Sequence, residues 1–185
     1  TIEFFDNIGG SLFPFQRIEG AQVEKGCVGT HACCVFQAGG VDTVAFLGSG
    51  WNEGISVYLG LNGIATKIAT QEIDTILSGY NEASLASAVV EARSDGDHQF
   101  LYVHLPDRTL VYDGGTSARL QTPVWFTLTT TTEGFAQYEA RFFVLVGNDW
   151  YCSHQDRIGR LDKSISTHWG DKVRWEIGTI IVYND

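Results

Sequence analysis

The stretch from Gln99 to Asp113 constrains the fold of this chain most strongly. In QFLYVHLPDRTLVYD, large side chains alternate between the two faces of an extended segment, Pro106-Asp107-Arg108 interrupts the run, and Thr109 to Tyr112 returns. This pattern predicts a β-hairpin. Because large side chains occupy both of its faces, we expect the sheet that holds the hairpin to be covered on both sides, as when one small sheet stacks between two others.

Short strands and turns recur along the rest of the chain. We expect about a dozen strands in groups of three or four, spaced at roughly 40 to 45 residues, the length of one propeller blade. Asn62-Gly63 is a strong hairpin signal, and Thr70 is predicted to begin a two-turn helix that ends at Ser78-Gly79. The segments 11–26 and 114–123 are predicted to be loops, and 136–146 and 173–183 are predicted strands.

The sequence therefore predicts an all-β fold, a partial β-propeller of about three blades with one or two short helices. We expect a single domain over residues 1–185, a fragment of a larger propeller, with blade-like units at about 27–77, 86–130 and 135–170. A closed ring needs about four to eight blades, so the terminal sheets are expected to show open edges or uncovered apolar faces. An ordinary β-sandwich with one inserted helix is the alternative fold.

Composition excludes some classes of function. The chain has 185 residues, 22 acidic against 12 basic, and a formal net charge of -10, which disfavours binding to duplex DNA or to an anionic membrane surface. An acidic wall beside DNA that slides past is still compatible with this charge. No stretch approaches the roughly 20 apolar residues that span a bilayer, and no signal peptide is apparent. Since the chain contains no Met, we expect residue 1 to result from processing or from a longer chain.

The cysteines and histidines do not form a recognisable metal motif. Cys27, Cys33, Cys34 and Cys152 lack the paired spacing of a zinc ribbon or a disulfide scaffold, and we expect reduced, mostly buried thiols of a protein made in the cytoplasm. The local cluster His31-Ala32-Cys33-Cys34 contains soft donors, but adjacent cysteines in a strand point to opposite faces and do not easily chelate one ion. His104, in the middle of a strand, is expected to pack on an aromatic neighbour.

Catalytic arrangements are equally weak. His154 with Asp156 resembles an acid–base pair, but no GxSxG nucleophile motif accompanies it. Propeller glycosidases use two facing carboxylates, for which the candidates here are Asp95, Asp97, Glu139 and Glu176.

The repeated Ser-x-Asp motif and the arginine cluster of sialidase blades are missing, so turn residues are the better interpretation of these carboxylates. A propeller glycosidase or carbohydrate-binding module is kept as the alternative function. Otherwise we expect no catalytic residue, no metal ion and no cofactor. Trp51, in a Gly-rich turn, is a candidate exposed anchor for a partner.

Several segments in order resemble one known family. They are TIEFFDN, VEKG, VYLGLNG, KIATQEID and the run SGYNEASLASAVVEARSDGDHQFLYVHLPDRTLVYD, followed by Trp125. Together they are similar to the middle of the packaged-DNA stabilisation protein of short-tailed lambdoid phages, the tail hub or tail accessory factor beneath the portal. The resemblance covers most of residues 1–162, and the HLPDRTLVYD hairpin has the greatest weight. Because that family's chains have several hundred residues, the resemblance implies that part of the propeller and a following domain are absent here.

The resemblance implies a structural role in the virion and no catalytic residue. Copies would form a homo-oligomeric ring that extends the portal channel, retains packaged DNA and serves its ejection. The implied partners are the adaptor ring below the portal, the tailspike and the needle, with assembly in the host cytoplasm. Contact with passing DNA would be non-specific at most, and no direct membrane insertion is expected. An acidic chain suits such a conduit, because its walls would not hold phosphates.

Overall fold

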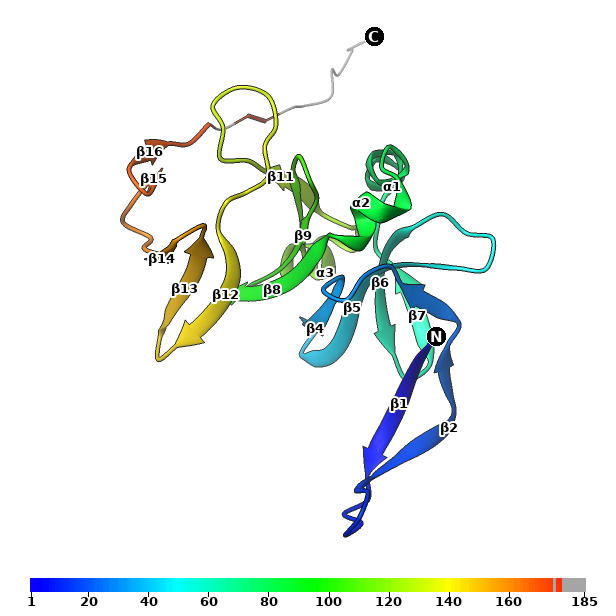
Figure 1. Ribbon diagram of the computed structural model, residues 1–185. Coiled ribbons are helices and arrows are strands. Elements are labelled where there is room, and N and C mark those ends of the chain that lie inside the picture. The colour runs from blue at the N-terminus through cyan, green and yellow to red at the C-terminus, as the bar shows by residue number, and fades with distance from the viewer. Residues whose placement is uncertain (175, 178–185) are drawn as a thin grey trace.

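The structure, a computed structural model, describes residues 1–174, 176 and 177. Within that part of the chain there are sixteen strands in five antiparallel sheets and three short helices. Figure 1 shows the sheets arranged side by side, with the N-terminal hairpin projecting at one end and the sheet that holds β12 and β13 at the other. No sheet of the described residues closes on itself. The all-β prediction is confirmed.

The first sheet is built around its longest strand. Its members are β3 (Lys25–Cys27), β4 (Cys33–Ala38), β5 (Val41–Gly50), β6 (Ser56–Leu61) and β7 (Ile64–Lys67). Along one edge β5 pairs with β3 and β4 in succession, and along the other edge it pairs with β6. The β6–β7 turn is Asn62-Gly63, with φ of 48° and 83°, so the predicted hairpin is confirmed.

The second sheet contains the predicted central hairpin. Its strands lie in the order β11-β10-β9-β8, namely β11 (Trp125–Leu128), β10 (Thr109–Asp113), β9 (His98–His104) and β8 (Val89–Asp95). In the hairpin, Leu110 lies opposite Val103 and Tyr112 opposite Leu101. The register places these four side chains on one face of the sheet, as the alternation predicts.

The remaining sheets lie at the two ends. The third sheet consists of β12 (Arg141–Val146), β13 (Asp149–His154) and β14 (Arg157–Arg160), and a small hairpin follows it, β15 (Thr167–His168) with β16 (Asp171–Lys172). At the other end β1 (Ile2–Asn7) pairs only with β2 (Phe15–Val23) among the described strands.

The second sheet is covered on both faces. On one face Leu101, Val103 and Leu110 are fully buried in a core shared with the first sheet. On the other face the ring of Tyr102 lies 4.9 Å from that of Phe143 in β12. One small sheet therefore packs between two others, which confirms the expectation drawn from the hairpin (Figure 1).

Two of the helices pack on the core between the first and second sheets. α1 (Gln71–Ser78) starts after Thr70 and buries Ile73 and Leu77, as predicted. α2 (Glu82–Ala86) buries Leu85, and the side chain of Asn81 caps it by accepting a hydrogen bond of 2.8 Å from the Ser84 amide. Both helices lie in the segment that joins the last strand of the first sheet to the first strand of the second.

A third helix lies where the sequence predicts a loop. α3 (Gly114–Leu120) begins after Asp113, whose carboxylate accepts a hydrogen bond of 3.0 Å from the Thr116 amide. A Cβ at Gly115 would lie 2.1 Å from the carbonyl oxygen of Asp97, so only glycine allows this close approach to the β8–β9 turn. The prediction of a loop over 114–123 is wrong there, and the described residues contain three helices rather than one or two.

Two strand predictions also differ from the structure. The predicted loop over 11–26 contains β2, because β1 supplies its hydrogen-bonding partner and places Ile2 opposite Val23. The strand predicted over 136–146 begins only at Arg141. The strand predicted over 173–183 falls largely outside the described residues.

Apolar side chains are exposed at both ends of the stack. On the N-terminal hairpin they are Phe5, Ile8, Leu12, Phe13 and Phe15, and on the third sheet they are Phe142, Val144, Leu145, Val146 and Ile158. Uncovered apolar surface is what an unclosed row of sheets is expected to leave. The division into propeller units at 27–77, 86–130 and 135–170 stays a prediction.

We predict that Leu101→Ala destabilises the chain by about 2–5 kcal/mol, because it opens a cavity in a fully buried position between two sheets. Urea unfolding followed by circular dichroism measures this change. Leu12→Ala is the matched control, since Leu12 is 99% exposed, and it should change stability by less than about 0.5 kcal/mol. Equal effects of the two substitutions would contradict the assigned core.

Candidate functional site

Polar and titratable side chains gather where the second sheet meets the third. Two features lie there, a buried hydrogen-bond chain centred on His104 and an open cleft beside it. Both are candidates for function because buried polar groups and concave surfaces are where chemistry and recognition concentrate.

His104 is fully inside the protein and both of its ring nitrogens are engaged. Its Nδ1 lies 3.0 Å from Thr109 Oγ1 and its Nε2 lies 2.7 Å from Glu91 Oε1. The hydroxyl of Thr109 also accepts a 3.0 Å hydrogen bond from the Tyr138 amide, and Glu91 Oε2 accepts one of 3.0 Å from the Phe143 amide. With the proton on Nε2, every donor in this chain has an acceptor.

Strand pairing explains this arrangement. His104 in β9 lies opposite Thr109 in β10, and Glu91 projects from β8 on the same face of the sheet. The ring of Tyr102 stacks on that of His104 with centroids 6.0 Å apart, which confirms the predicted aromatic neighbour. The network therefore fixes the backbone at residues 138 and 143 to the second sheet, which makes it a structural joint.

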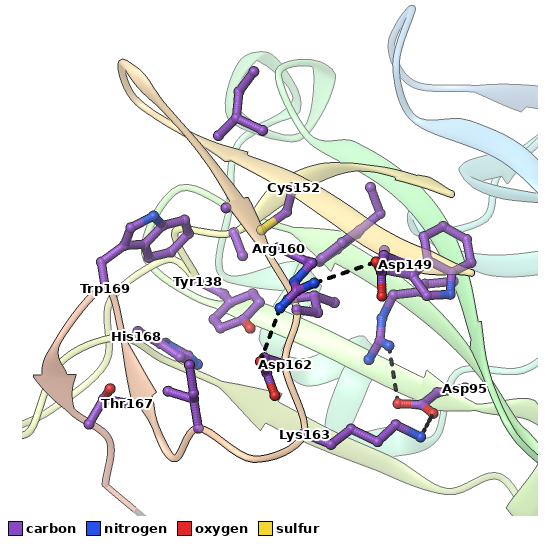
Figure 2. Close-up of a pocket in the computed structure, with 18 of the residues that line it drawn as sticks. Asp95, Tyr138, Asp149, Cys152, Arg160, Asp162, Lys163, Thr167, His168 and Trp169 are labelled. Atoms are coloured by element: carbon purple, nitrogen blue, oxygen red, sulfur yellow. Dashed lines mark hydrogen bonds and ion pairs between the residues drawn. The ribbon is translucent and has the colours of Figure 1, made fainter. Parts of the chain in front are cut away.

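The cleft lies between the edge of the second sheet and the chain that follows β14. It has a volume of about 1090 Å³, and Figure 2 shows Tyr138, Cys152, His168 and Trp169 around it. The buried side chains of Tyr138, Ala140 and Cys152 form a small core of their own beside it.

Ion pairs occupy the rim of the cleft. Asp95 accepts hydrogen bonds from Lys163 at 2.6 Å and from Arg93 at 3.2 Å (Figure 2). Arg160 lies 3.6 Å from Asp149 and 3.4 Å from Asp162. The pair between Lys163 and Asp95 connects the segment after β14 to the second sheet.

Burial shifts the pKa values of three titratable groups in the cleft. Burial raises the pKa of the Cys152 thiol, and burial likewise raises the pKa of the Tyr138 hydroxyl. Burial lowers the pKa of His168, although Glu139 opposes the shift, and its Nδ1 has no hydrogen-bond partner among the residues that the structure describes. These shifts favour the protonated thiol and hydroxyl and the neutral imidazole.

The acid–base pair considered for His154 and Asp156 does not form. His154 Nε2 lies 3.3 Å from Glu139 Oε2, whereas Asp156 lies 3.8 Å from the Nε of Arg157. Glu139 therefore takes the place expected for Asp156.

The carboxylates considered for a glycosidase site have basic partners nearby. Asp95 pairs with Arg93 and Lys163, Glu139 with His154, and Glu176 with Arg174. Asp97 lies at the turn between β8 and β9, as expected for a turn residue.

The cysteine predictions are partly wrong. Cys33 and Cys34 point to opposite faces as expected, but Cys27 and Cys33 are exposed and Cys34 is half-buried, so only Cys152 is a buried thiol. The reason is that Cys27 and Cys33 lie on the face of the first sheet opposite the shared core, whereas Cys34 packs against that core. No group of three His, Cys, Asp or Glu in the described part of the chain could hold a metal ion.

Trp51 is exposed, as the sequence predicts for a partner anchor. It is 91% exposed in the turn between β5 and β6. The base of this turn is held by an ion pair between Lys25 and Glu53 and by a 3.2 Å hydrogen bond that the Tyr58 hydroxyl donates to Glu53.

Sequence reasoning singled out His104 but missed its partners Glu91 and Thr109. Their signal was available, since polar residues in a sheet buried on both faces need hydrogen-bond partners. Only the fold shows that the backbone amides of Tyr138 and Phe143 complete the network.

Antiparallel sheets packed side by side, none of them closed among the described residues, are what part of a β-propeller is expected to show. The chain belongs to the family described as Bacteriophage P22 Gp10, beta-propeller, whose model matches residues 1–166. It is 30% identical over 176 residues to the tail hub protein gp10 of Salmonella phage P22, an alignment that covers 91% of this chain and 35% of the relative. The chain thus spans about a third of that relative's length. Both findings confirm the family resemblance seen in the sequence.

The matched relative is named a tail hub protein of a phage. No helix in the described residues is both long and apolar enough to span a membrane.

We predict that Thr109→Val loosens the joint between the second sheet and the third. The substitution leaves the Tyr138 amide and His104 Nδ1 without a partner, at a cost of about 1–3 kcal/mol. Hydrogen exchange should show faster exchange of the Tyr138 amide. Thr43→Val is the control, because the buried Thr43 hydroxyl bonds to the Phe36 carbonyl in the first sheet. Unchanged exchange at Tyr138 in Thr109→Val would contradict the assigned joint.

We also predict a loss of stability in acid that depends on Asp95. The hydrogen bond from Lys163, together with that from Arg93, lowers the pKa of Asp95 in the folded chain below its unfolded value of about 3.9. The contribution is therefore fully present above about pH 4 and is lost as the pH falls through the folded value.

Thermal unfolding between about pH 5 and 2 measures this effect. Asp95→Asn should reduce the fall in unfolding temperature at acid pH, and Lys163→Met should reduce it as well. Asp156→Asn is the control, since the side chain of Asp156 is 88% exposed. An identical acid profile for Asp95→Asn and the parent chain would refute the assignment.

Proposed function

We propose that this chain is part of a tail hub that extends the channel below the portal, retains packaged DNA and serves its ejection. The observation that carries the proposal is the family match over residues 1–166. Because the chain spans 35% of the relative's length, the activity of the whole hub is inferred for the complete protein.

We further propose that several copies form a ring and contact the adaptor ring, the tailspike and the needle. The exposed apolar side chains at both ends of the stack support contacts with other protein surfaces there, because isolated soluble domains rarely expose apolar patches of this kind. The exposed Trp51 on a braced turn supports a protein contact at that turn as well.

The charge of the chain supports a conduit rather than a DNA-binding module. With a net charge of -10, the protein would repel phosphates on average and leave passing DNA free to slide. We propose no enzymatic role, and the raised pKa values of the thiol and the hydroxyl in the cleft are consistent with that.

We propose assembly in the host cytoplasm.

DNA retention tests the proposal. Phage particles made without this protein should fill with DNA and then lose it, and adding the purified full protein should preserve the DNA against external nuclease. An equal amount of an unrelated acidic protein is the control and should preserve nothing. Stable DNA retention in particles that lack the protein would overturn the proposal. Tight binding of the purified protein to duplex DNA at low salt would contradict the conduit argument.

A further inference from the structure

Two exposed cysteines flank the loop that joins β3 to β4. Cys27 is the last residue of β3 and Cys33 is the first residue of β4. The two strands pair with the same edge of β5, so the loop leaves that edge and returns to it.

The pairing shows how near the two cysteines lie. Cys27 lies opposite Gly48 and Cys33 opposite Phe46, two residues apart along β5. Leu47 lies between these two positions and bonds to both ends of the loop. Its carbonyl accepts a hydrogen bond of 3.0 Å from the Val28 amide, and its amide donates one of 2.8 Å to the Ala32 carbonyl.

This spacing is suited to a disulfide. Positions two apart along a strand point to the same face, and their Cα atoms are separated by about 6.6 Å. Disulfides usually join Cα atoms separated by about 4.4–6.8 Å. Both thiols therefore project from the face that carries Phe46, where Gly48 has no side chain to separate them.

The loop between the cysteines connects the first sheet to the second. The carbonyl of His31 accepts a hydrogen bond of 2.8 Å from the Val90 amide in β8. Gly29 packs so closely on α2 that a Cβ there would lie 2.1 Å from the carbonyl oxygen of Ala86. A change in this loop would therefore act on the contact between the two sheets.

We propose that Cys27 and Cys33 form a reversible disulfide that staples this loop and so stiffens the joint between the first and second sheets. With oxidised glutathione as the oxidant, the two thiols are oxidised to one S–S bond and each glutathione disulfide is reduced to two glutathione thiols, which take up the two protons. The Cys27 thiol, which donates to the Gly29 carbonyl at 3.2 Å, must turn toward Cys33 to form the bond.

The other two thiols are poorly placed to compete. Burial raises the pKa of Cys34 to about 12, and its side chain lies on the opposite face from Cys33. Cys152 is buried in the third sheet, where burial raises the pKa of its thiol. Burial, together with the neighbouring Cys27, also raises the pKa of Cys33, so exchange should be faster in mildly alkaline buffer.

The disulfide would stiffen the joint between the first and second sheets in the assembled phage particle. Because bacterial cytoplasm keeps thiols reduced, the bond would form after release from the host. This timing rests on the proposed function, whereas formation of the bond itself does not.

Thiol mapping tests the proposal. The purified full protein is equilibrated with oxidised glutathione at mildly alkaline pH, blocked with a maleimide under native conditions, and digested for mass spectrometry. We expect a linked peptide pair containing Cys27 and Cys33 and the loss of two hydrogen atoms. Hydrogen exchange at the Val90 amide should slow by about tenfold or more after oxidation.

Matched variants separate the outcomes. Cys27→Ser and Cys33→Ser should each abolish the linked peptide and the slower exchange at Val90, while Cys34→Ser and Cys152→Ser should keep both. Free Cys27 and Cys33 after equilibration, or a link from either one to Cys34, to glutathione only or to another copy, would overturn the proposal. Formation of the bond in purified protein together with free thiols in released particles would overturn the timing and leave the DNA-retention result unaffected.

Discussion

The rest of the structure depends on the burial of both faces of the second sheet. Leu101 and Val103 pack against the first sheet, while Tyr102 and His104 face the third, so neither neighbour can be removed without exposing a large apolar or polar surface. Burial of a large apolar side chain contributes about 1.5–3 kcal/mol, and the alternating pattern places such side chains on both faces. The side-by-side order of the sheets follows from this requirement.

The two joints of the second sheet differ in chemistry. Toward the first sheet the contact is apolar and is supplemented by the loop between Cys27 and Cys33. Toward the third sheet a buried hydrogen-bond chain through Glu91, His104 and Thr109 fixes the backbone. A satisfied polar network resists displacement, because displacement leaves donors without partners. The joint to the third sheet is therefore specified by hydrogen bonds, and the joint to the first sheet mainly by apolar packing.

A structural role agrees with this organisation. Sheets that cover one another in a row leave apolar side chains at the ends, and in a family of tail hub proteins such surfaces are suited to assembly. The cleft beside the third sheet contains a buried thiol and a buried hydroxyl, both with a raised pKa, and Asp95 on its rim is paired with Lys163.

The sequence by itself determined the elements whose signals are local: the hairpin from Gln99 to Asp113, the Asn62-Gly63 turn and the helix after Thr70. Family membership could also be inferred from it. Only the tertiary structure decided that β2 is a strand, that α3 follows Asp113, and that Cys27 lies beside Cys33. These features depend on partners distant in sequence: a strand needs a neighbouring strand, a Gly-Gly helix start needs the turn it packs against, and two thiols meet only because β5 aligns them.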